Sequence, residues 1–209
     1  MKKICILLVL MLALACVPAF AAEGDAVLGV SNENRLNFSY GFSQGDTLYM
    51  VSYGTLYTYK VGDSDLKEYS IKLPEDMGDV GASFEYATLP FAADGKLYSL
   101  NLITEYNENT EFKGATVTEL TLQDNNSIKS TKVCDVDWSE LVEFYDNSSY
   151  PIQPDSILGM GNQAFARYYD SMGDYHTLAI DLASGATRDV DWLGGAYTIT
   201  PYKDGTLLA

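Results

Sequence analysis

The chain of 209 residues has few basic side chains, few cysteines and a single histidine. Thirteen Lys and Arg stand against 29 Asp and Glu, which gives a formal net charge of -16 at pH 7. The shortage of basic residues argues against sequence-independent nucleic-acid binding and against docking on anionic lipid, because both need a basic surface. We therefore expect no nucleic-acid partner.

Recognisable catalytic signatures are also missing. The sequence has no Gly-x-Ser-x-Gly nucleophile motif, no Walker loop and no dinucleotide-binding glycine pattern. The one histidine, His176, has no His or Cys companion with which to hold a transition metal. We predict no catalytic residue and no metal ligand, and we favour a protein that binds over one that catalyses.

Three pairs of aspartates have one residue between their members, a spacing that places both side chains on one face of a strand. The pairs are Asp63 with Asp65, Asp135 with Asp137, and Asp189 with Asp191. In a turn, such a pair could hold calcium through hard oxygen ligands, but no segment matches an EF-hand loop. Our interpretation is no cofactor and solvated turn carboxylates, with calcium as the alternative.

The amino-terminal residues have the parts of a secretory signal peptide. Residues 2–3 are lysines, residues 4–17 form an unbroken apolar run, and residues 19–21 read Ala-Phe-Ala. We expect cleavage after Ala21, since the apolar run is short for a membrane span. The predicted localisation is secreted or extracytoplasmic at the cell surface, with no integral membrane span after cleavage.

Removal of this signal changes two counts. Lys2 and Lys3 leave, so that 11 Lys and Arg face 29 Asp and Glu and the net charge becomes -18. Cys134 is then the one cysteine, which allows no disulfide within the chain and is expected as a small buried residue. An exported protein without disulfides suits a bacterium better than a small eukaryotic secreted module. A lipoprotein anchored through Cys16 is the weaker alternative.

The remainder is rich in packing material, with 47% hydrophobic residues and 16 tyrosines. Tyr69, Ile71 and Leu73 alternate with polar residues, as expected for a half-buried strand. A short turn motif recurs: residues 45–49 read Gly-Asp-Thr-Leu-Tyr, 94–98 Asp-Gly-Lys-Leu-Tyr, 204–208 Asp-Gly-Thr-Leu-Leu and, more loosely, 161–165 Gly-Asn-Gln-Ala-Phe. Each copy predicts a tight hairpin turn followed by a strand, so the fold class is all-β.

The spacing of these turns predicts repeated four-stranded units. After a linker at 22–35, the units lie at about 36–73, 83–138, 155–192 and 196–209. The word Asp-Val-Asp-Trp ends the second unit and the third. Four-stranded units of about 40 to 50 residues are the blades of a β-propeller.

Residues 46–59 are similar to bacterial exported β-propellers whose blades read Asp-Gly-x-Leu-Tyr followed by Leu-Tyr-x-Tyr-Asp. The resemblance covers residues 36–209 and implies about three blades and the start of a fourth. Because propellers close with typically about four to eight blades, we expect an amino-terminal fragment of a longer protein. An immunoglobulin-like sandwich is the structural alternative, although it does not explain the repeated turn.

In a propeller, the loops between the second and third strands and those between blades open onto one face. The first kind of loop holds Tyr53, Tyr106 and Tyr169, and the second kind begins at Trp138 and Trp192. These five aromatics are our candidate ligand-binding residues, because a ring packs on CH groups while nearby oxygens take hydrogen bonds. The alternative is that the tyrosines fill the space between blades.

These observations favour a non-catalytic extracytoplasmic β-propeller that binds a protein, peptide or carbohydrate ligand. One alternative is an accessory propeller of a larger exported protein, such as a transport-linked solute-binding protein. Another is a propeller enzyme whose catalytic residues lie beyond Ala209. Fold alone does not choose among them.

The longest interval between turns contains an insertion around residues 139–154. Asp137, with Glu140 three residues later, fits a capping box and predicts a short helix. Leu141, Val142 and Phe144 would then pack this helix onto the blade.

Overall fold

The computed structural model describes residues 40–52, 55–71, 84–106, 108–190, 193, 200–201 and 207–208. The expected signal peptide and linker, Tyr53 and Trp192 lie outside the described residues. The described part is built of strands and contains no α-helix, so the predicted all-β class is confirmed.

Three four-stranded antiparallel sheets account for most strands, and in each the strands pair in chain order. The first sheet comprises β1 (Tyr40–Gln44), β2 (Thr47–Ser52), β3 (Thr55–Lys60) and β4 (Lys67–Ser70). The second comprises β5 (Phe84–Ala93), β6 (Lys96–Tyr106), β7 (Thr110–Leu122) and β8 (Ile128–Val136). The third comprises β11 (Ser156–Met160), β12 (Gln163–Tyr169), β13 (Tyr175–Asp181) and β14 (Thr187–Asp189).

Two smaller antiparallel pairs complete the strands. A hairpin of β9 (Val142–Tyr145) and β10 (Ser148–Pro151) lies between the second and third sheets in the chain. The short strands β15 (Thr200–Pro201) and β16 (Leu207–Leu208) pair after the third sheet.

The recurring motif forms the turn between the first two strands of each large sheet. Gln44 pairs with Thr47, Ala93 with Lys96, and Met160 with Gln163, so each hairpin has a two-residue loop. All three loops contain a glycine with positive φ, namely Gly45 at 61°, Gly95 at 75° and Gly161 at 58°. Glycine adopts this backbone without a Cβ clash, which explains why the motif carries it. The copy at 204–208 lies largely outside the described residues.

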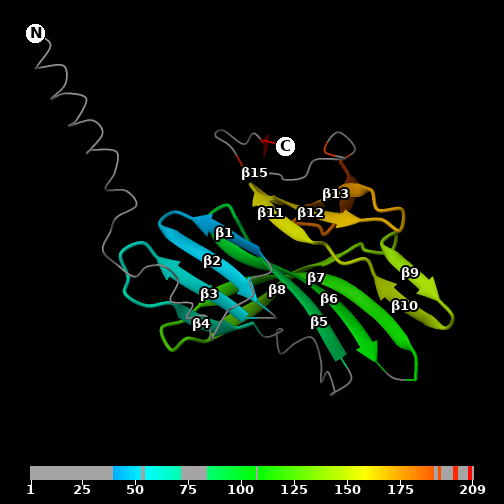
Figure 1. Cartoon of the computed structure of the whole chain (residues 1–209), viewed down its shortest axis with the longest axis horizontal. Coiled ribbons are helices and arrows are strands. Elements are labelled where there is room, and N and C mark those ends of the chain that lie inside the picture. Colours follow the sequence, from blue (N-terminus) through cyan, green and yellow to red (C-terminus); the bar gives the residue numbers. More distant parts are fainter. Residues whose placement is uncertain are drawn as a thin grey trace, which may run out of the picture.

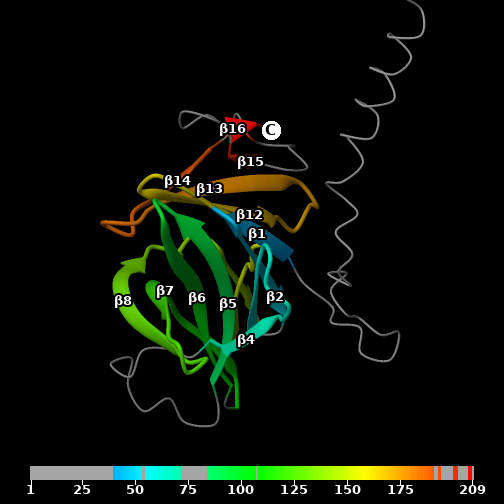
Figure 2. The same ribbon diagram turned by 90° about the vertical axis from the view of Figure 1, so that its left-hand side faces the viewer.

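The second sheet lies between the other two and packs against one of them on each of its faces. Leu100, Leu102 and Val117 point into the main core shared with the third sheet, whereas Leu97 and Leu120 pack against the first sheet. The period of two along each strand alternates side chains between these two cores. Figure 1 shows the three sheets, and Figure 2 shows the third lying across the second with the first to the side.

The first strands of the sheets are neighbours in space. β5 contacts both β1 and β11, and β11 in turn contacts β15. The approach of β11 to β5 is so close that a Cβ on Gly159 would lie 2.2 Å from the Ala92 carbonyl oxygen. Glycine at this position is therefore a packing requirement.

The insertion at 139–154 forms the β9–β10 hairpin, so the predicted short helix is wrong. Asp137 does act as expected locally, because its Oδ1 accepts a hydrogen bond from the Ser139 amide at 3.2 Å. The chain then makes a single turn, closed by Leu141 N to Trp138 O at 3.0 Å, and extends into β9. Asp146, with a φ of 53°, lies in the tight turn between β9 and β10, where the sequence had predicted a helix.

Candidate functional site

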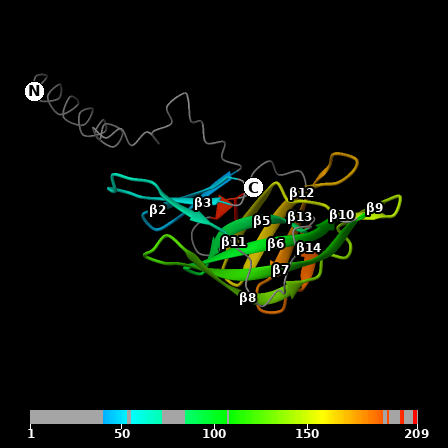
Figure 3. The same ribbon diagram turned by 90° about the horizontal axis from the view of Figure 1, so that it is seen from below.

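The exposed aromatic side chains gather at one end of the molecule, which we call the aromatic end. It is formed by the β6–β7 turn, the β12–β13 turn and the β9–β10 hairpin, all on the right-hand side in Figure 1 and again in Figure 3. Among the residues whose side-chain exposure the structure describes, all the exposed aromatic rings lie here: Tyr106, Phe144, Tyr145, Tyr150 and Tyr169. The opposite end, with the β3–β4 and β7–β8 turns, has none among its described residues.

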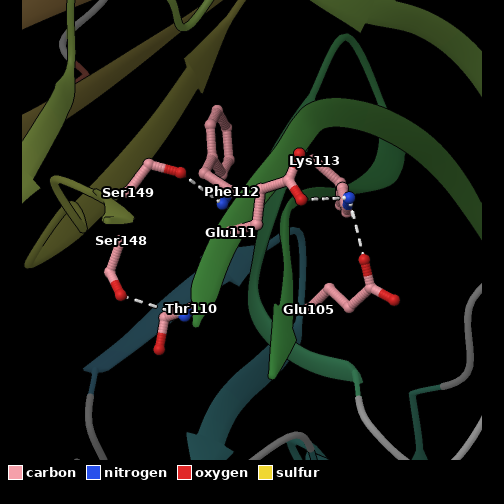
Figure 4. Close-up of polar contacts among 7 residues, drawn as sticks. All are labelled: Glu105, Thr110, Glu111, Phe112, Lys113, Ser148 and Ser149. Carbon is pink, nitrogen blue, oxygen red and sulfur yellow. Dashed lines mark hydrogen bonds and ion pairs between the residues drawn. The ribbon is translucent and has the colours of Figure 1, made fainter. Parts of the chain in front are cut away.

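The β9–β10 hairpin carries the most exposed rings, with Phe144 at 79% and Tyr145 at 74%. Its second strand is fixed to the start of β7 by two serine hydroxyls, as Figure 4 shows. The Thr110 amide donates to Ser148 Oγ at 3.1 Å, and the Phe112 amide donates to Ser149 Oγ at 2.9 Å. The hairpin is thus attached to the second sheet through side chains, which leaves its outward rings in solvent.

A cation beside this attachment is held by two carboxylates. Lys113 Nζ lies 2.8 Å from a Glu105 oxygen and 2.6 Å from a Glu111 oxygen. Hydrogen bonds to Glu105 and then Glu111 raise the pKa of Lys113 above its ordinary value. The single positive charge is outnumbered, so this part of the aromatic end remains negative.

The other cation of the aromatic end is clamped in the third sheet. Arg167 donates from Nε and Nη2 to both carboxylate oxygens of Asp155, at 3.0 and 2.7 Å. Its Cζ lies 4.7 Å from the centroid of the Tyr175 ring, and that ring packs against Tyr169 with centroids 3.8 Å apart. A guanidinium between a carboxylate and an aromatic face is a strong and oriented arrangement.

The β12–β13 turn is organised by one carboxylate. Asp170 Oδ1 accepts hydrogen bonds from the amides of Met172 and Asp174, both at 2.9 Å, and Oδ2 lies 3.1 Å from His176 Nε2. The Asp174 amide first, and then His176, lower the pKa of Asp170 below its ordinary value. His176 also stacks on Tyr168 with centroids 5.4 Å apart, so the histidine helps to hold the turn.

The candidate residues chosen from the sequence divide into three groups. Tyr106 and Tyr169 lie exposed at the aromatic end, while Tyr53 and Trp192 fall outside the described residues. Trp138 is a core residue with 2% of its surface exposed, and its Nε1 donates to the Ile152 carbonyl at 3.2 Å. Because the chain returns over the indole after the hairpin, neither ring face of Trp138 is open to a ligand.

Sequence reasoning missed the three rings of the hairpin, Phe144, Tyr145 and Tyr150. Part of the signal was present, since Val142, Phe144 and Tyr145 favour a strand and the turn residues Asp146 and Asn147 follow them directly. The capping-box pattern at Asp137 competed with it and assigned Phe144 to a buried helix face.

No cluster suited to a metal is found in the part of the chain that the structure describes, where no three His, Cys, Asp or Glu side chains gather. Asp135 pairs with Lys132 at 2.7 Å, and Asp137 accepts the Ser139 hydroxyl at 2.7 Å. Cys134 is half-buried, and desolvation, followed by the Asp135 charge, raises the pKa of its thiol. A thiol with a raised pKa is a poor nucleophile near neutral pH.

The aromatic end therefore brings together exposed rings, carboxylates and two cations that are already paired with carboxylates. Within the described residues, no apolar helix reaches the length that a membrane crossing needs. No protein-family model matches the chain, and the search of the curated proteins likewise gave no match.

Proposed function

We propose that this protein is a non-catalytic binding protein of the β-propeller class, exported from a bacterial cell, which takes its ligand at the aromatic end. The proposal of a propeller is supported by three consecutive four-stranded meanders. It is also supported by the contacts of β1 with β5, β5 with β11 and β11 with β15, since first strands line the axis of a propeller.

The main support for a binding function is the position of the exposed aromatic side chains. Those whose exposure the structure describes all lie at one end of the molecule. Exposed aromatic patches of this kind mark interaction sites, because their burial against a partner removes apolar area from water. The β6–β7 turn, the β12–β13 turn and the hairpin come from different sheets, so a shared ligand explains why all three carry exposed rings.

The experiment compares the mature protein with the double variant Phe144→Ser/Tyr145→Ser on arrays of glycans and peptides. We expect ligands of the wild type to lose at least about tenfold in affinity for the variant, as interface aromatics are frequent hot spots. Val61→Ser is the matched control, since Val61 is 72% exposed in the β3–β4 turn at the opposite end. Equal binding by wild type and double variant would overturn the proposed site.

The proposed export has its own test. Expression of the complete chain in a bacterium should yield a processed protein outside the cytoplasm whose first residue is Ala22, read by amino-terminal sequencing. A cytoplasmic product that still begins at Met1 would contradict export.

A further inference from the structure

We propose that the ligand of the aromatic end is a cationic polypeptide segment, and that its Lys or Arg side chains bind between the hairpin rings and the carboxylates beside them. This inference rests on the proposed binding function and names its partner class. The proposed binding surface is the β9–β10 hairpin with its exposed rings Phe144 and Tyr145.

The first step concerns the ring faces of Phe144 and Tyr145, which the other described side chains leave largely uncovered. Phe144 and Tyr145 are adjacent on β9, so their side chains point to opposite faces of the two-stranded sheet. With 79% and 74% of their surfaces exposed, both rings leave a face open to a partner. An open π face attracts cations as well as apolar groups, since its quadrupole places negative charge above the ring.

The second step concerns the charge around these rings. Glu140, Glu143 and Asp146 are exposed on the hairpin and its approach, and among the described residues none of them forms an ion pair. Glu143 lies opposite Tyr150 in the β9–β10 register, which sets a carboxylate beside a partly exposed ring. Glu143 also shares its face of β9 with Tyr145, since residues two apart on a strand point the same way. Tyr145 and Tyr150 thus stand beside a carboxylate that forms no ion pair with a described residue.

The third step concerns the cations that are present. Lys113 is already shared by Glu105 and Glu111, and Arg167 is already bonded through two nitrogens to Asp155. Neither is available to neutralise the hairpin carboxylates. These carboxylates are therefore free to pair with cationic side chains of a partner.

The fourth step is that the aromatic end already holds one cation in the proposed manner. Arg167 lies between the Asp155 carboxylate and the Tyr175 ring, with its Cζ 4.7 Å from the ring centroid. A partner arginine between Glu143 or Asp146 and a hairpin ring would repeat this geometry. The same charge repels nucleic acid and anionic lipid, and a neutral glycan would gain nothing from it.

The test measures binding of fluorescent peptides by anisotropy, with one peptide alternating Arg with Gly and Ser and another carrying Gln in place of each Arg. We expect the Arg peptide to bind and the Gln peptide to bind at least about tenfold more weakly, with affinity falling as salt rises. Phe144→Ser/Tyr145→Ser and, separately, Glu143→Gln/Asp146→Asn should each weaken the Arg peptide by about five- to tenfold.

The control Asp63→Asn/Asp65→Asn removes the same two charges from the β3–β4 turn at the opposite end and should stay within about twofold of wild type. Equal losses in this control would show general attraction to an acidic protein and overturn the inference. A glycan or neutral peptide whose binding depends on Phe144 and Tyr145 would also overturn it while leaving the proposed function standing. If no ligand of any kind depends on those rings, both proposals fail.

Discussion

Single residues decide how tightly the sheets approach one another. A Cβ on Gly185 would lie 1.7 Å from the Asp135 carbonyl oxygen, so the turn before β14 rests directly on the end of β8. The same contact includes a hydrogen bond from the Asp137 amide to the Gly185 carbonyl at 3.2 Å. A glycine here serves backbone conformation and packing at once.

Gly185→Ala should therefore destabilise the protein more than Gly161→Ala. Both glycines have positive φ, at 74° and 58°, but a Cβ on Gly161 meets nothing within 4 Å. We expect a loss of roughly 1 kcal/mol for Gly161→Ala from backbone strain alone, and a further loss of about 1–3 kcal/mol for Gly185→Ala from overpacking. Urea unfolding measures both, and equal losses would contradict the close contact.

Carboxylates that organise turns should make stability depend on pH in the acid range. Asp181 Oδ1 accepts the Ser184 hydroxyl at 2.8 Å and the Ser184 amide at 2.9 Å, and these two bonds, largest first, lower the pKa of Asp181 from its ordinary value of 3.8. A pKa that is lower in the folded state stabilises the protein above 3.8, and this contribution is lost as pH falls below that value.

Asp181→Asn should accordingly lower the free energy of unfolding more at pH 7 than at about pH 2.5. Asparagine keeps the side-chain oxygen but not its charge. The difference between the losses in free energy of unfolding at the two pH values therefore reports the contribution of the ionised carboxylate. Asp124→Asn, in the exposed β7–β8 turn, is the control. A loss for Asp181→Asn that is the same at both pH values, measured by urea unfolding, would contradict the assignment.

At the scale of elements, the β9–β10 hairpin is attached to the second sheet through side chains and not through a backbone ladder. It meets β7 through the hydroxyls of Ser148 and Ser149, which accept the Thr110 and Phe112 amides. These amides lie on the part of β7 that extends beyond its pairing with β8, which begins at Ala115. The hairpin thus covers an edge that the sheet itself leaves unpaired.

Ser148→Ala/Ser149→Ala should loosen the hairpin without unfolding the sheets. Each lost hydrogen bond is worth about 0.5–1.5 kcal/mol, so the Thr110 and Phe112 amides should exchange with solvent about tenfold faster or more. Native-state hydrogen exchange followed by NMR measures this, with Ser70→Ala on the exposed side of β4 as control. Unchanged exchange at both amides would show that the hydroxyls do not hold the hairpin.

At the scale of the whole molecule, excess negative charge opposes folding. The formal net charge of -16 repels itself in the compact state, and Asp and Glu outnumber Lys and Arg by more than two to one. Salt screens this repulsion, since raising ionic strength from about 0.01 M to about 1 M shortens the Debye length from about 30 Å to about 3 Å. The repulsion between uncompensated charges therefore lowers the free energy of unfolding by an amount that depends on ionic strength.

We expect the thermal unfolding midpoint to rise when NaCl is increased over this range. Circular dichroism at a series of NaCl concentrations measures the midpoint, and sucrose of matched osmolarity controls for solute exclusion. A midpoint that falls with NaCl would mean that the exposed ion pairs, such as Lys96 with Glu119 and Lys60 with Asp46, contribute more than the repulsion removes.

Much of the fold could be predicted because its signals are local. The alternation around Tyr69 and the glycine turns at 45–49 and 94–98 depend on neighbours in the chain. The structure has strand β4 through Tyr69, although it ends at Ser70, and two-residue turns at both glycine motifs. The hairpin was mispredicted because the pattern at Asp137 fits both a helix cap and an isolated turn. Packing of the segment against β7, which local sequence does not encode, selects the turn.

The sequence by itself determined the all-β class, the repeated turn and the acidity, because strand period, positive φ and charge are properties of residue types and spacing. Only the tertiary structure decided which aromatics serve the core and which face solvent. Trp138 is buried because Ile152 returns over its indole, whereas Phe144 is exposed because Ser148 and Ser149 attach the hairpin by its other strand. Exposure depends on what the distant chain covers, and that depends on long-range packing.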